Sequence, residues 1–428
     1  MRYKVYLAIL FCLFICDSSR GQGIPQWGNW NAWGEYQDSL YRNPIIPADF
    51  SDIDCIRVGE DYYAISSTFQ FSPGMTVLHS KDLVNWKICG HAVEDLTQIS
   101  PELSWQRMNR YSRGIWAGTI RYHRNRFYIF FGTPDEGFFM TSAANPEGPW
   151  EPLHPIMKEA GWDDCSVLFD DNGDVCFVGT HFADNYKTYL FRMTSDAKSI
   201  DKLSAQLVNE GSGREASKLI KVNGWYYLVT AEGGTEFKHC VTMCRSRKLT
   251  GPYEISPYAP VLTSFGKDVQ LKRAGHGQII QGKDGNWYMA HLCSRSLDDC
   301  SIVGRETAIQ NMTLTEDGWF KLSANDTASP EDFFEVPEEV EVKSAKSGFT
   351  DFGKVTELPL EYMTLRQSAK TCGITISDGK LHIQGGNSLA SKYNQGLLVR
   401  RHQHHSYDFT AKMEFAPRDY CHMAGLVC

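Results

Sequence analysis

A short pattern of two strands around a tight turn recurs five times along the chain. Each copy starts with an apolar stretch, passes through a polar turn and continues into a second apolar or aromatic stretch. Three of the turns contain Asn-Gly or Asp-Gly, which favours the positive φ angles of a two-residue hairpin. The copies read IRVGEDYYAIS (56–66), IRYHRNRFYIFFG (120–132), VLFDDNGDVCFVG (167–179), LIKVNGWYYLVT (219–230) and IIQGKDGNWYMAH (279–291).

The spacing of these copies predicts the architecture. Corresponding positions in successive copies are 65, 48, 51 and 61 residues apart, and further strand-like segments fill each interval. Units of this size, rich in short strands, are typical of β-propeller blades. No sustained helical periodicity interrupts them. We therefore expect an all-β fold with a five-bladed β-propeller over residues 41–335; a repeated β-sandwich is the alternative. The marker positions are Tyr63, Tyr128, Cys176, Tyr227 and Tyr288.

The two ends of the chain differ from this repeat. Residues 1–21 combine a short positive start with an apolar stretch too short to span a bilayer, which predicts a secretory signal peptide. Residues 22–40 are expected to be a linker, and the charged segment 336–345 is expected to be another. Residues 346–428 show the alternation of strands in a second β domain. That length is below the ~100 residues of a typical sandwich, so we expect this domain to be incomplete.

The net charge and the hydropathy of the chain argue against two classes of protein, those that bind nucleic acid and those that span a membrane. The formal net charge of -8 argues against a nucleic-acid-binding protein, which normally presents a basic face. No apolar stretch after the signal reaches transmembrane length. We expect the mature chain to be secreted or periplasmic, or at most tethered to the cell surface through Cys16.

The cysteines do not suggest a metal site. Two of the 13 lie in the expected signal, and most others sit inside strand-like runs, as Cys55 and Cys176 do. Such positions are typical of small buried apolar residues. Cys293 and Cys300 are candidates for pairing across a loop. The run RRHQHH (400–405) offers metal-ligating side chains, but alternation along a strand is the better account of it.

Carboxylates stand before or at the start of the first strand of three units. Asp52 precedes the first unit, Asp163 and Asp164 precede the third, and Glu215 precedes the fourth. Because the innermost strands of a propeller surround one central channel, a closed ring brings these residues together. Hydrolysis of a glycosidic bond needs one protonated carboxylic acid and one ionised carboxylate. A third acid nearby raises the pKa of the proton donor, since like charges disfavour ionisation.

Two tryptophans near these strand starts fit the same hypothesis. Trp116 and Trp162 would supply apolar walls on which a sugar ring can stack. The alternative is that the carboxylates only cap turns and strands, and composition alone does not separate the two accounts.

The residues around the acids resemble glycoside hydrolase family 43. The stretch NPIIPADFSDIDCIRVGEDYYAISSTFQFSPGMTVLHSKDLVNW (43–86) is similar to the family's opening, which continues into an Arg-Val-Gly-Asp-x-Tyr-Tyr hairpin. Later segments match in order and spacing, which makes the resemblance specific over residues 41 to 330. These segments are GIWAGTIRYHRNRFYIFFG (114–132), GWDDCSVLFDDNG (161–173), GREASKLIKVNGWYYL (213–228), GHGQII (275–280) and GRETAIQNMTLTEDGW (304–319).

The resemblance implies a five-bladed propeller of inverting glycosidases, mostly β-xylosidases and α-L-arabinofuranosidases. It implies a general base at Asp52, a pKa-tuning acid at Asp164 and a general acid at Glu215. Asp49 and Asp54 would be bystanders. The tail at 346–428 resembles the start of the concanavalin-like β-sandwich found in the xylosidase-like branch, where it can help to close the sugar pocket.

The same resemblance implies a sugar pocket with a histidine at its centre. Arg305 matches an arginine that contacts the pocket, and Trp116, Phe71 and Trp162 are the aromatic candidates for sugar binding. His276 matches a histidine often found near a metal ion or a water on the axis. A structural calcium or sodium ion near His276 is therefore allowed, whereas the reaction itself requires no cofactor.

Three prolines of the family pattern are absent. Pro-Asp-Pro is Ser51-Asp52-Ile53 here, Trp-Ala-Pro is Trp116-Ala117-Gly118, and Asp-Pro is Asp164-Cys165. Without these prolines the loops that orient the acids are looser, or the chain belongs to a different branch of the family. Either change affects the expected substrate more than the expected chemistry. We expect an exported, exo-acting, inverting glycosidase that hydrolyses terminal β-D-xylosyl or α-L-arabinofuranosyl residues of plant polysaccharides or oligosaccharides. A non-catalytic carbohydrate-binding propeller and an endo-acting arabinanase are the alternatives.

Overall fold

The computed structural model describes residues 36–37, 40–107, 110–211, 213–338, 340 and 349–428. The signal predicted at 1–21 lies outside these residues, as do parts of the predicted linkers. The described residues form no α-helix, and their helical turns are the 3-10 segments η2 (Leu96–Gln98), η3 (Pro101–Leu103) and η4 (Phe182–Asp184). None of these turns is long and apolar enough to cross a membrane.

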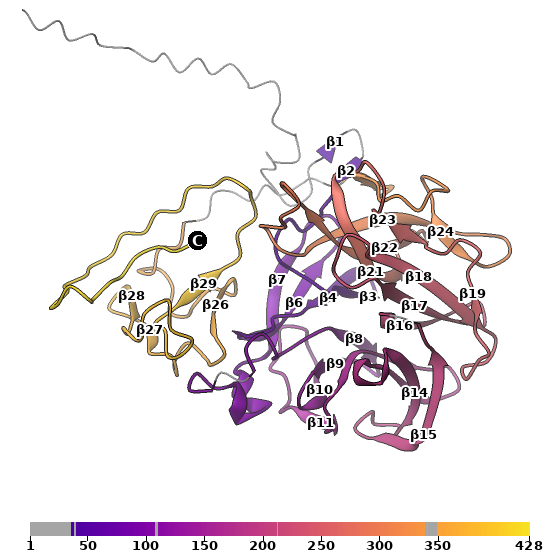
Figure 1. The fold of residues 1–428 in the computed structure, drawn as a ribbon, viewed down its shortest axis with the longest axis horizontal. Helices are drawn as coiled ribbons and strands as arrows, with labels where there is room; N and C mark the ends of the chain where they lie inside the picture. The colour runs from indigo at the N-terminus through magenta and orange to yellow at the C-terminus, as the bar shows by residue number, and fades with distance from the viewer. Residues whose placement is uncertain (1–35, 38–39, 108–109, 212, 339, 341–348) are drawn as a thin grey trace, which may run out of the picture.

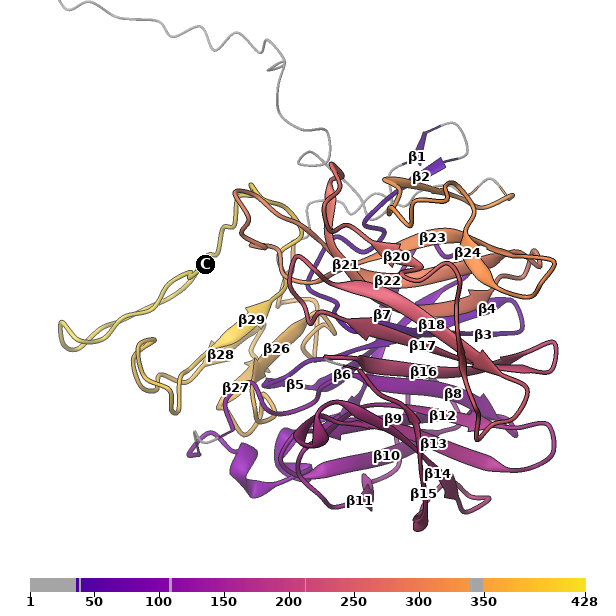
Figure 2. The same ribbon diagram turned by 45° about the vertical axis from the view of Figure 1, so that its right-hand side comes forward.

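Five antiparallel sheets make up the bulk of the molecule (Figures 1 and 2). Blade one contains β3 (Asp54–Val58), β4 (Asp61–Ser66), β6 (Gly74–Ser80) and β7 (Lys87–Val93). Blade two contains β8 (Gly118–His123), β9 (Arg126–Thr133), β10 (Gly137–Ala143) and β11 (His154–Met157). Blade three contains β12 (Trp162–Phe169), β13 (Val175–His181), β14 (Lys187–Met193) and β15 (Ile200–Asn209).

The last two blades follow the same order. Blade four contains β16 (Glu215–Val222), β17 (Trp225–Glu232), β18 (Cys240–Ser246) and β19 (Glu254–Ile255), and β20 (Leu262–Thr263) also pairs with β18. Blade five contains β21 (Leu271–Gln281), β22 (Trp287–Arg295), β23 (Glu306–Leu314) and β24 (Phe320–Leu322). The inner strands β3, β8, β12 and β16 contact one another in sequence. Strand β21 of blade five contacts β17 and β18 of blade four on one side and β3 of blade one on the other. The ring is thus closed, and the predicted all-β, five-bladed propeller is confirmed.

The five predicted hairpins are the first two strands of the five blades. Between β16 and β17, Asn223 and Gly224 both have positive φ angles, of 49° and 71°, as a two-residue hairpin turn requires. Val222 and Trp225 are the last paired residues on either side of this turn. The Asn-Gly signal therefore identified this turn correctly from local backbone chemistry alone.

Apolar side chains fill the spaces between neighbouring blades. Between blades one and two, for example, Ile65 packs in one cluster with Ile120 and Phe131. Cys55 and Cys176 are buried in such clusters, as expected. The proposed Cys293–Cys300 pairing is wrong: both thiols are free, as are the other cysteines of the described residues. Cys293 is buried in a strand of blade five with Leu271 and Ala308, whereas Cys300 is exposed on the following loop. The list of free thiols is Cys55, Cys89, Cys165, Cys176, Cys240, Cys244, Cys293, Cys300, Cys372, Cys421 and Cys428.

The chain closes the ring by returning to its own start. β2 (Leu40–Arg42) pairs with β25 (Phe333–Glu335) and with the short β1 (Tyr36–Gln37). The Asn43 side chain donates to the carbonyl of Ile309 at 2.7 Å and accepts from its N–H at 2.9 Å. These bonds fasten the segment before β3 to blade five, so that residues 49–52 run beside the segment that leads into β23.

The second β domain lies against one side of the propeller (Figures 1 and 2). Its strand β26 (Tyr362–Leu365) lies between β29 (Leu398–Arg400) and β5 (Phe71–Ser72), and β5 belongs to the propeller. A separate hairpin is formed by β27 (Ile374–Ser377) and β28 (Lys380–Ile383).

The run RRHQHH is not a continuous strand. Strand β29 ends at Arg400, so the prediction of strand alternation fails for residues 401–405. These residues instead contact the propeller, because His402 and His405 donate to the carbonyls of Ile302 and Arg295.

Candidate active site

The three acids assigned to chemistry gather in one cluster. Asp52 lies two residues before β3, Asp164 is the third residue of β12, and Glu215 is the first residue of β16. After burial, the charges of Asp164 and Asp52 have the largest effect on the pKa of Glu215. Blades one, three and four thus deliver carboxyl groups that act on one another electrostatically.

The backbone at and beside these acids has irregular conformations that orient their side chains. Asp52, Asp164, Ala216 and His276 all have positive φ angles, between 46° and 58°, which are uncommon for residues other than glycine. In β12, β16 and β21 the strand pairing shifts register at these positions. A β-bulge of this kind turns a side chain away from the regular alternation of a strand. Unusual backbone held at three inner strands is typical of a functional site.

Asp52 is held as an anion. Its Oδ2 accepts a hydrogen bond from Ser67 at 2.7 Å, and its Oδ1 accepts one from the guanidinium of Arg305 at 2.9 Å. Burial opposes ionisation of this side chain, which is 6 % exposed. The positive charge of Arg305, the nearby His276 and the hydroxyls of Ser67 and Ser51 outweigh burial and lower the pKa of Asp52.

Glu215 and Asp164 are shifted in the opposite direction. Burial, followed by the charges of Asp164 and Asp52, raises the pKa of Glu215 to about 8. Burial also raises the pKa of Asp164 to about 6, although the Lys218 ammonium and a 2.7 Å hydrogen bond from the Ala216 N–H favour its ionised form. At neutral pH the cluster therefore holds an ionised Asp52 beside a protonated Glu215, which is the division of roles that acid–base chemistry needs.

Asp163 adds a fourth carboxyl group beside this cluster. Burial, and then the charge of Asp164, raises the pKa of Asp163 well above its usual value. Its Oδ1 is buried without a hydrogen-bond partner in the described part of the chain. The neutral, protonated form of Asp163 fits this environment.

Asp54, two residues after Asp52, has structural contacts instead. Asp54 is fully buried, and it accepts from the Ile120 N–H and from Arg121, each at 2.9 Å. The Lys218 ammonium lies 3.3 Å away and also donates to the Gly118 carbonyl at 2.7 Å. Burial opposes ionisation of Asp54, but the two cations lower its pKa. Asp54 thus ties blade one to blades two and four.

The predicted aromatic walls differ in exposure. Trp116 is partly exposed; its indole N–H donates to the Ser112 carbonyl at 2.8 Å, and its ring centre lies 6.5 Å from that of Phe182. Trp162 is only 6 % exposed and stacks on His181, with ring centres 4.2 Å apart. Trp162 is mainly a packing residue of blade three, so Trp116 offers the more accessible ring.

Phe69, and not the predicted Phe71, is the aromatic residue of this loop that contacts Arg305. Phe71 lies in β5, where it pairs with Leu365 of the second domain. Phe69 instead places its ring 4.8 Å from the guanidinium carbon of Arg305. Sequence reasoning missed Phe69 and Ser67, and the only signal for them was their place in SSTFQF, directly after the first hairpin.

His276 lies beside Asp52 in this cluster. Its Nδ1 is 3.7 Å from Oδ1 of Asp52, and its Nε2 is buried without a hydrogen-bond partner among the described residues. Burial lowers the pKa of His276 to about 3, so the imidazole is neutral and can offer a nitrogen lone pair. That atom fits one ligand to an ion or a water. No group of three or more His, Cys, Asp or Glu side chains is placed to hold a metal in the described ranges.

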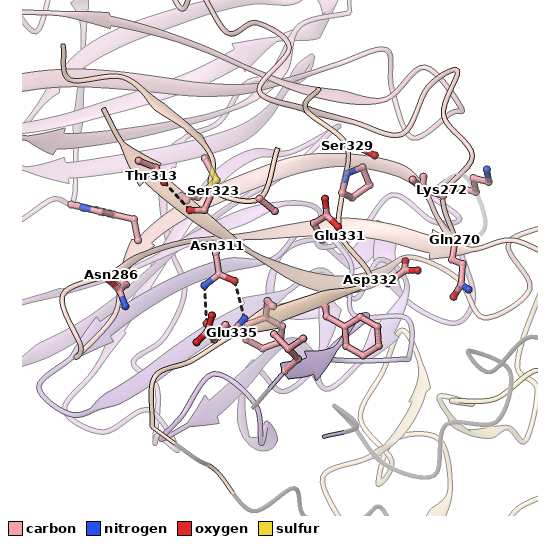
Figure 3. Close-up of a pocket in the computed structure, with 18 of the residues that line it drawn as sticks. Gln270, Lys272, Asn286, Asn311, Thr313, Ser323, Ser329, Glu331, Asp332 and Glu335 are labelled. Atoms are coloured by element: carbon pink, nitrogen blue, oxygen red, sulfur yellow. Dashed lines mark hydrogen bonds between the residues drawn. The ribbon is translucent and has the colours of Figure 1, made fainter. Parts of the chain in front are cut away.

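A separate hollow of about 1380 Å³ lies on the outer part of blade five (Figure 3). Its lining mixes polar and apolar residues, and the polar ones include Asn311 and Thr313 of β23, together with Ser323 and Glu335. The Asn311 side chain hydrogen-bonds the backbone of Glu335, and Thr313 bonds Ser323. None of the clustered acids lines this hollow.

Comparison with known families accounts for both parts of the chain. Residues 41–320 match the model for glycosyl hydrolases family 43. The chain belongs to glycoside hydrolase family 43. Residues 350–428 match the beta xylosidase C-terminal concanavalin A-like domain, which confirms the predicted nature of the second domain. Membership of family 43 makes the protein a glycoside hydrolase.

Relatives within family 43 cover most of the chain. A Vibrio sp protein named xylan 1,3-beta-xylosidase is 34% identical over 421 residues, covering 90% of this chain and 76% of that protein. The Humicola insolens xylosidase/arabinosidase 43B is 34% identical over 412 residues, covering 90% and 73%. The crystal structure of the family 43 protein BlXynB from Bacillus licheniformis superposes with a TM-score of 0.75 at 33% identity, covering 86% of this chain and 72% of that one.

Proposed function

We propose that this family 43 member is an exo-acting, inverting glycosidase that releases terminal β-D-xylosyl or α-L-arabinofuranosyl residues from plant polysaccharides or oligosaccharides. The observation that carries the proposal is the opposite protonation of two carboxyl groups in one cluster. Asp52 has a lowered pKa, whereas the pKa of Glu215 is raised to about 8. The names of the Vibrio and Humicola relatives support a pentose as the sugar.

In the proposed mechanism Asp52 is the general base and Glu215 is the general acid. Asp52 accepts a proton from a water molecule, and the water oxygen attacks the anomeric carbon. The bond between that carbon and the leaving oxygen breaks while Glu215 transfers its proton to the leaving oxygen. Attack from the face opposite the leaving group inverts the configuration. Product release and exchange of protons with solvent return Asp52 to the anion and Glu215 to the acid.

Two further residues support these protonation states. Asp164 keeps the pKa of Glu215 high, because its negative charge disfavours a second charge nearby. Arg305 keeps Asp52 ionised through the 2.9 Å ion pair. The Arg305 side chain is 26% exposed, so it can also face a bound sugar. His276 would hold an ion or a water through Nε2, and an ion there would supply a fixed positive charge.

We further propose that the enzyme acts outside the cytoplasm. The support is the sequence pattern of residues 1–21, a short positive start followed by a short apolar stretch. A polysaccharide substrate is consistent with export, since such polymers are found outside cells.

The test is a substrate panel combined with the stereochemistry of the product. We expect release of 4-nitrophenol from its β-D-xylopyranoside or its α-L-arabinofuranoside, and none from its β-D-galactopyranoside. Proton NMR of the first-formed sugar should show the inverted anomer, for example α-xylose from the β-xyloside. A retained anomer would overturn the inverting mechanism. A folded protein that is inert on both pentosides would favour a carbohydrate-binding propeller, and release of internal fragments from linear arabinan would favour an endo-acting arabinanase.

A further inference from the structure

The loop before β3, residues 49–52, bonds both the backbone and the guanidinium of Arg305. Asp49 Oδ1 accepts a hydrogen bond from the backbone N–H of Arg305 at 3.0 Å. Asp52 Oδ1 accepts one from the guanidinium of the same arginine at 2.9 Å. The fit is close, because a Cβ added to Gly304 would lie 2.7 Å from Cγ of Asp49. A shift of residues 49–52 would therefore alter the contact between Asp52 and Arg305.

Arg401 of the second domain holds this loop from the other side. Its Nε donates to the carbonyl of Asp49 at 2.6 Å, and its guanidinium lies 4.3 Å from the ring centre of Phe50. Burial lowers the pKa of Arg401 to about 10, which leaves it charged at neutral pH. A guanidinium that bonds a carbonyl and covers an aromatic face fixes both groups in a way that a lysine cannot fully reproduce.

The second domain also contacts the other loop that supports Asp52. Strand β26 pairs with β5, and the N–H of Arg366 donates to the Gln70 carbonyl at 2.7 Å. Just before these residues, Ser67 donates to Oδ2 of Asp52 and Phe69 covers the guanidinium of Arg305. The loop at residues 49–52 and the loop at residues 67–71 are thus both bonded to the second domain.

We propose that Arg401 is a positioning residue for the Asp52–Arg305 pair, acting through the Asp49 carbonyl and the Phe50 ring. This role rests on the proposed function, because it concerns the residue assigned there as general base. The second domain then does more than lie beside the propeller, since it sets the geometry of a residue that reacts. Among the described residues, Arg401 makes no side-chain bond to Asp52, Asp164 or Glu215. Its bonds go to the Asp49 carbonyl and, within the second domain, to the sulfur of Met363.

The charges around Asp52 give this role a specific readout. Arg305 faces it from the segment before β23, neutral His276 from β21 and neutral His239 from the residue before β18. Three acids face it as well: Asp163 and Asp164 from β12, and Glu215 from β16. If the loop moves and the contact with Arg305 weakens, these acids remain and the main cation is lost. The pKa of Asp52 then rises, and the acid limb of the kcat/KM profile moves to higher pH.

The experiment compares Arg401→Ala and Arg401→Lys with a matched control. Arg400→Ala removes the neighbouring arginine, which is exposed and lies on β29. We measure kcat, KM and the pH profile on the preferred 4-nitrophenyl pentoside. For Arg401→Ala we expect kcat/KM to fall on the order of 10- to 100-fold, as small misplacements of a reacting group do, with the acid limb shifted upward. Arg401→Lys should recover part of the loss, and Arg400→Ala should match the wild type.

A second measurement tests the role without catalysis. Carbon-13 NMR of the Asp52 carboxyl, assigned by its loss in Asp52→Asn, reports its pKa directly in the wild type and in Arg401→Ala. Melting curves give the folded fraction of each variant. An unchanged Asp52 pKa, or a loss of activity that follows only the folded fraction with an unshifted pH profile, would overturn the role of Arg401. A wild type that hydrolyses no pentoside would instead overturn the proposed function, and the NMR comparison would still decide the positioning role.

Discussion

Arg305 and Asp52 form a 2.9 Å ion pair although 253 positions separate them in the chain. The contact exists because the ring closes: residues 43–46 bond to blade five, which places the start of the chain beside the segment before β23. The charge of the proposed base therefore depends on correct closure of the whole propeller.

Removing the charge of Arg305 should shift the acid side of the pH profile. Because Arg305 is the main cation that lowers the pKa of Asp52, Arg305→Met should raise that pKa. The acid limb of kcat/KM then moves to higher pH. Loss of a hydrogen bond between charged groups, about 1.5–3 kcal/mol, predicts a decrease of about 10- to 150-fold in kcat/KM. Arg247→Met, on the surface of blade four, is the control; an acid limb that stays in place would contradict this account.

The alkaline limb of the kcat/KM pH profile should depend on Asp164. The pKa of Glu215 is about 8, so kcat/KM should fall above that pH as the general acid loses its proton. Asp164→Asn removes the charge that, after burial, contributes most to this raised pKa. The alkaline limb should therefore move to lower pH, which pH–rate profiles would reveal. Asp171→Asn, at an exposed neighbouring turn, should leave the limb unchanged.

The buried contacts of Asp54 should contribute to the free energy of unfolding. Asp54→Ala leaves Arg121 and Lys218 buried without their shared carboxylate, which predicts a loss of about 3–5 kcal/mol in the free energy of unfolding. Because the pKa of Asp54 is lowered in the folded state, its contribution is present above the unfolded value near 3.8 and is lost as pH falls through the folded value. Urea unfolding at pH 7 and at pH 3 should show a smaller difference between variant and wild type at the lower pH. An equal difference at both would contradict the assignment.

The thiols should behave as free and mostly buried groups. Reducing agent should leave the melting temperature unchanged, because none of the described cysteines is paired. A thiol reagent should modify exposed Cys300, Cys421 and Cys428 in the native state and reach buried Cys293 only after unfolding. Detection of a Cys293–Cys300 disulfide by mass spectrometry would contradict the structure.

The blades and the acids were predictable because their signals are local. Hairpin turns such as Asn223-Gly224 reflect backbone preferences of adjacent residues. Five recurrences of the hairpin pattern, with acids before three of them, indicate a ring. Phe69 and Ser67 were missed because their roles depend on contacts with Arg305 and Asp52 across the closed ring. No local pattern encodes such contacts.

The second domain shows the same limit. Residues 401–405 follow a strand-like run and were predicted to continue it, yet hydrogen bonds to propeller carbonyls replace strand pairing there. Trp162 was a reasonable candidate for a sugar wall by residue type, but its place inside blade three, against His181, could be known only from packing.

In the proposed mechanism Glu215 donates the proton to the leaving group. The most direct measurement is kcat/KM of Glu215→Gln on an unactivated disaccharide such as xylobiose and on the preferred 4-nitrophenyl pentoside, with Glu210→Gln as the control. We predict a loss of about 10²- to 10⁴-fold on the disaccharide, a smaller loss on the activated substrate, and no loss in the control. Equal and small losses on both substrates would contradict the assignment of Glu215 as the general acid.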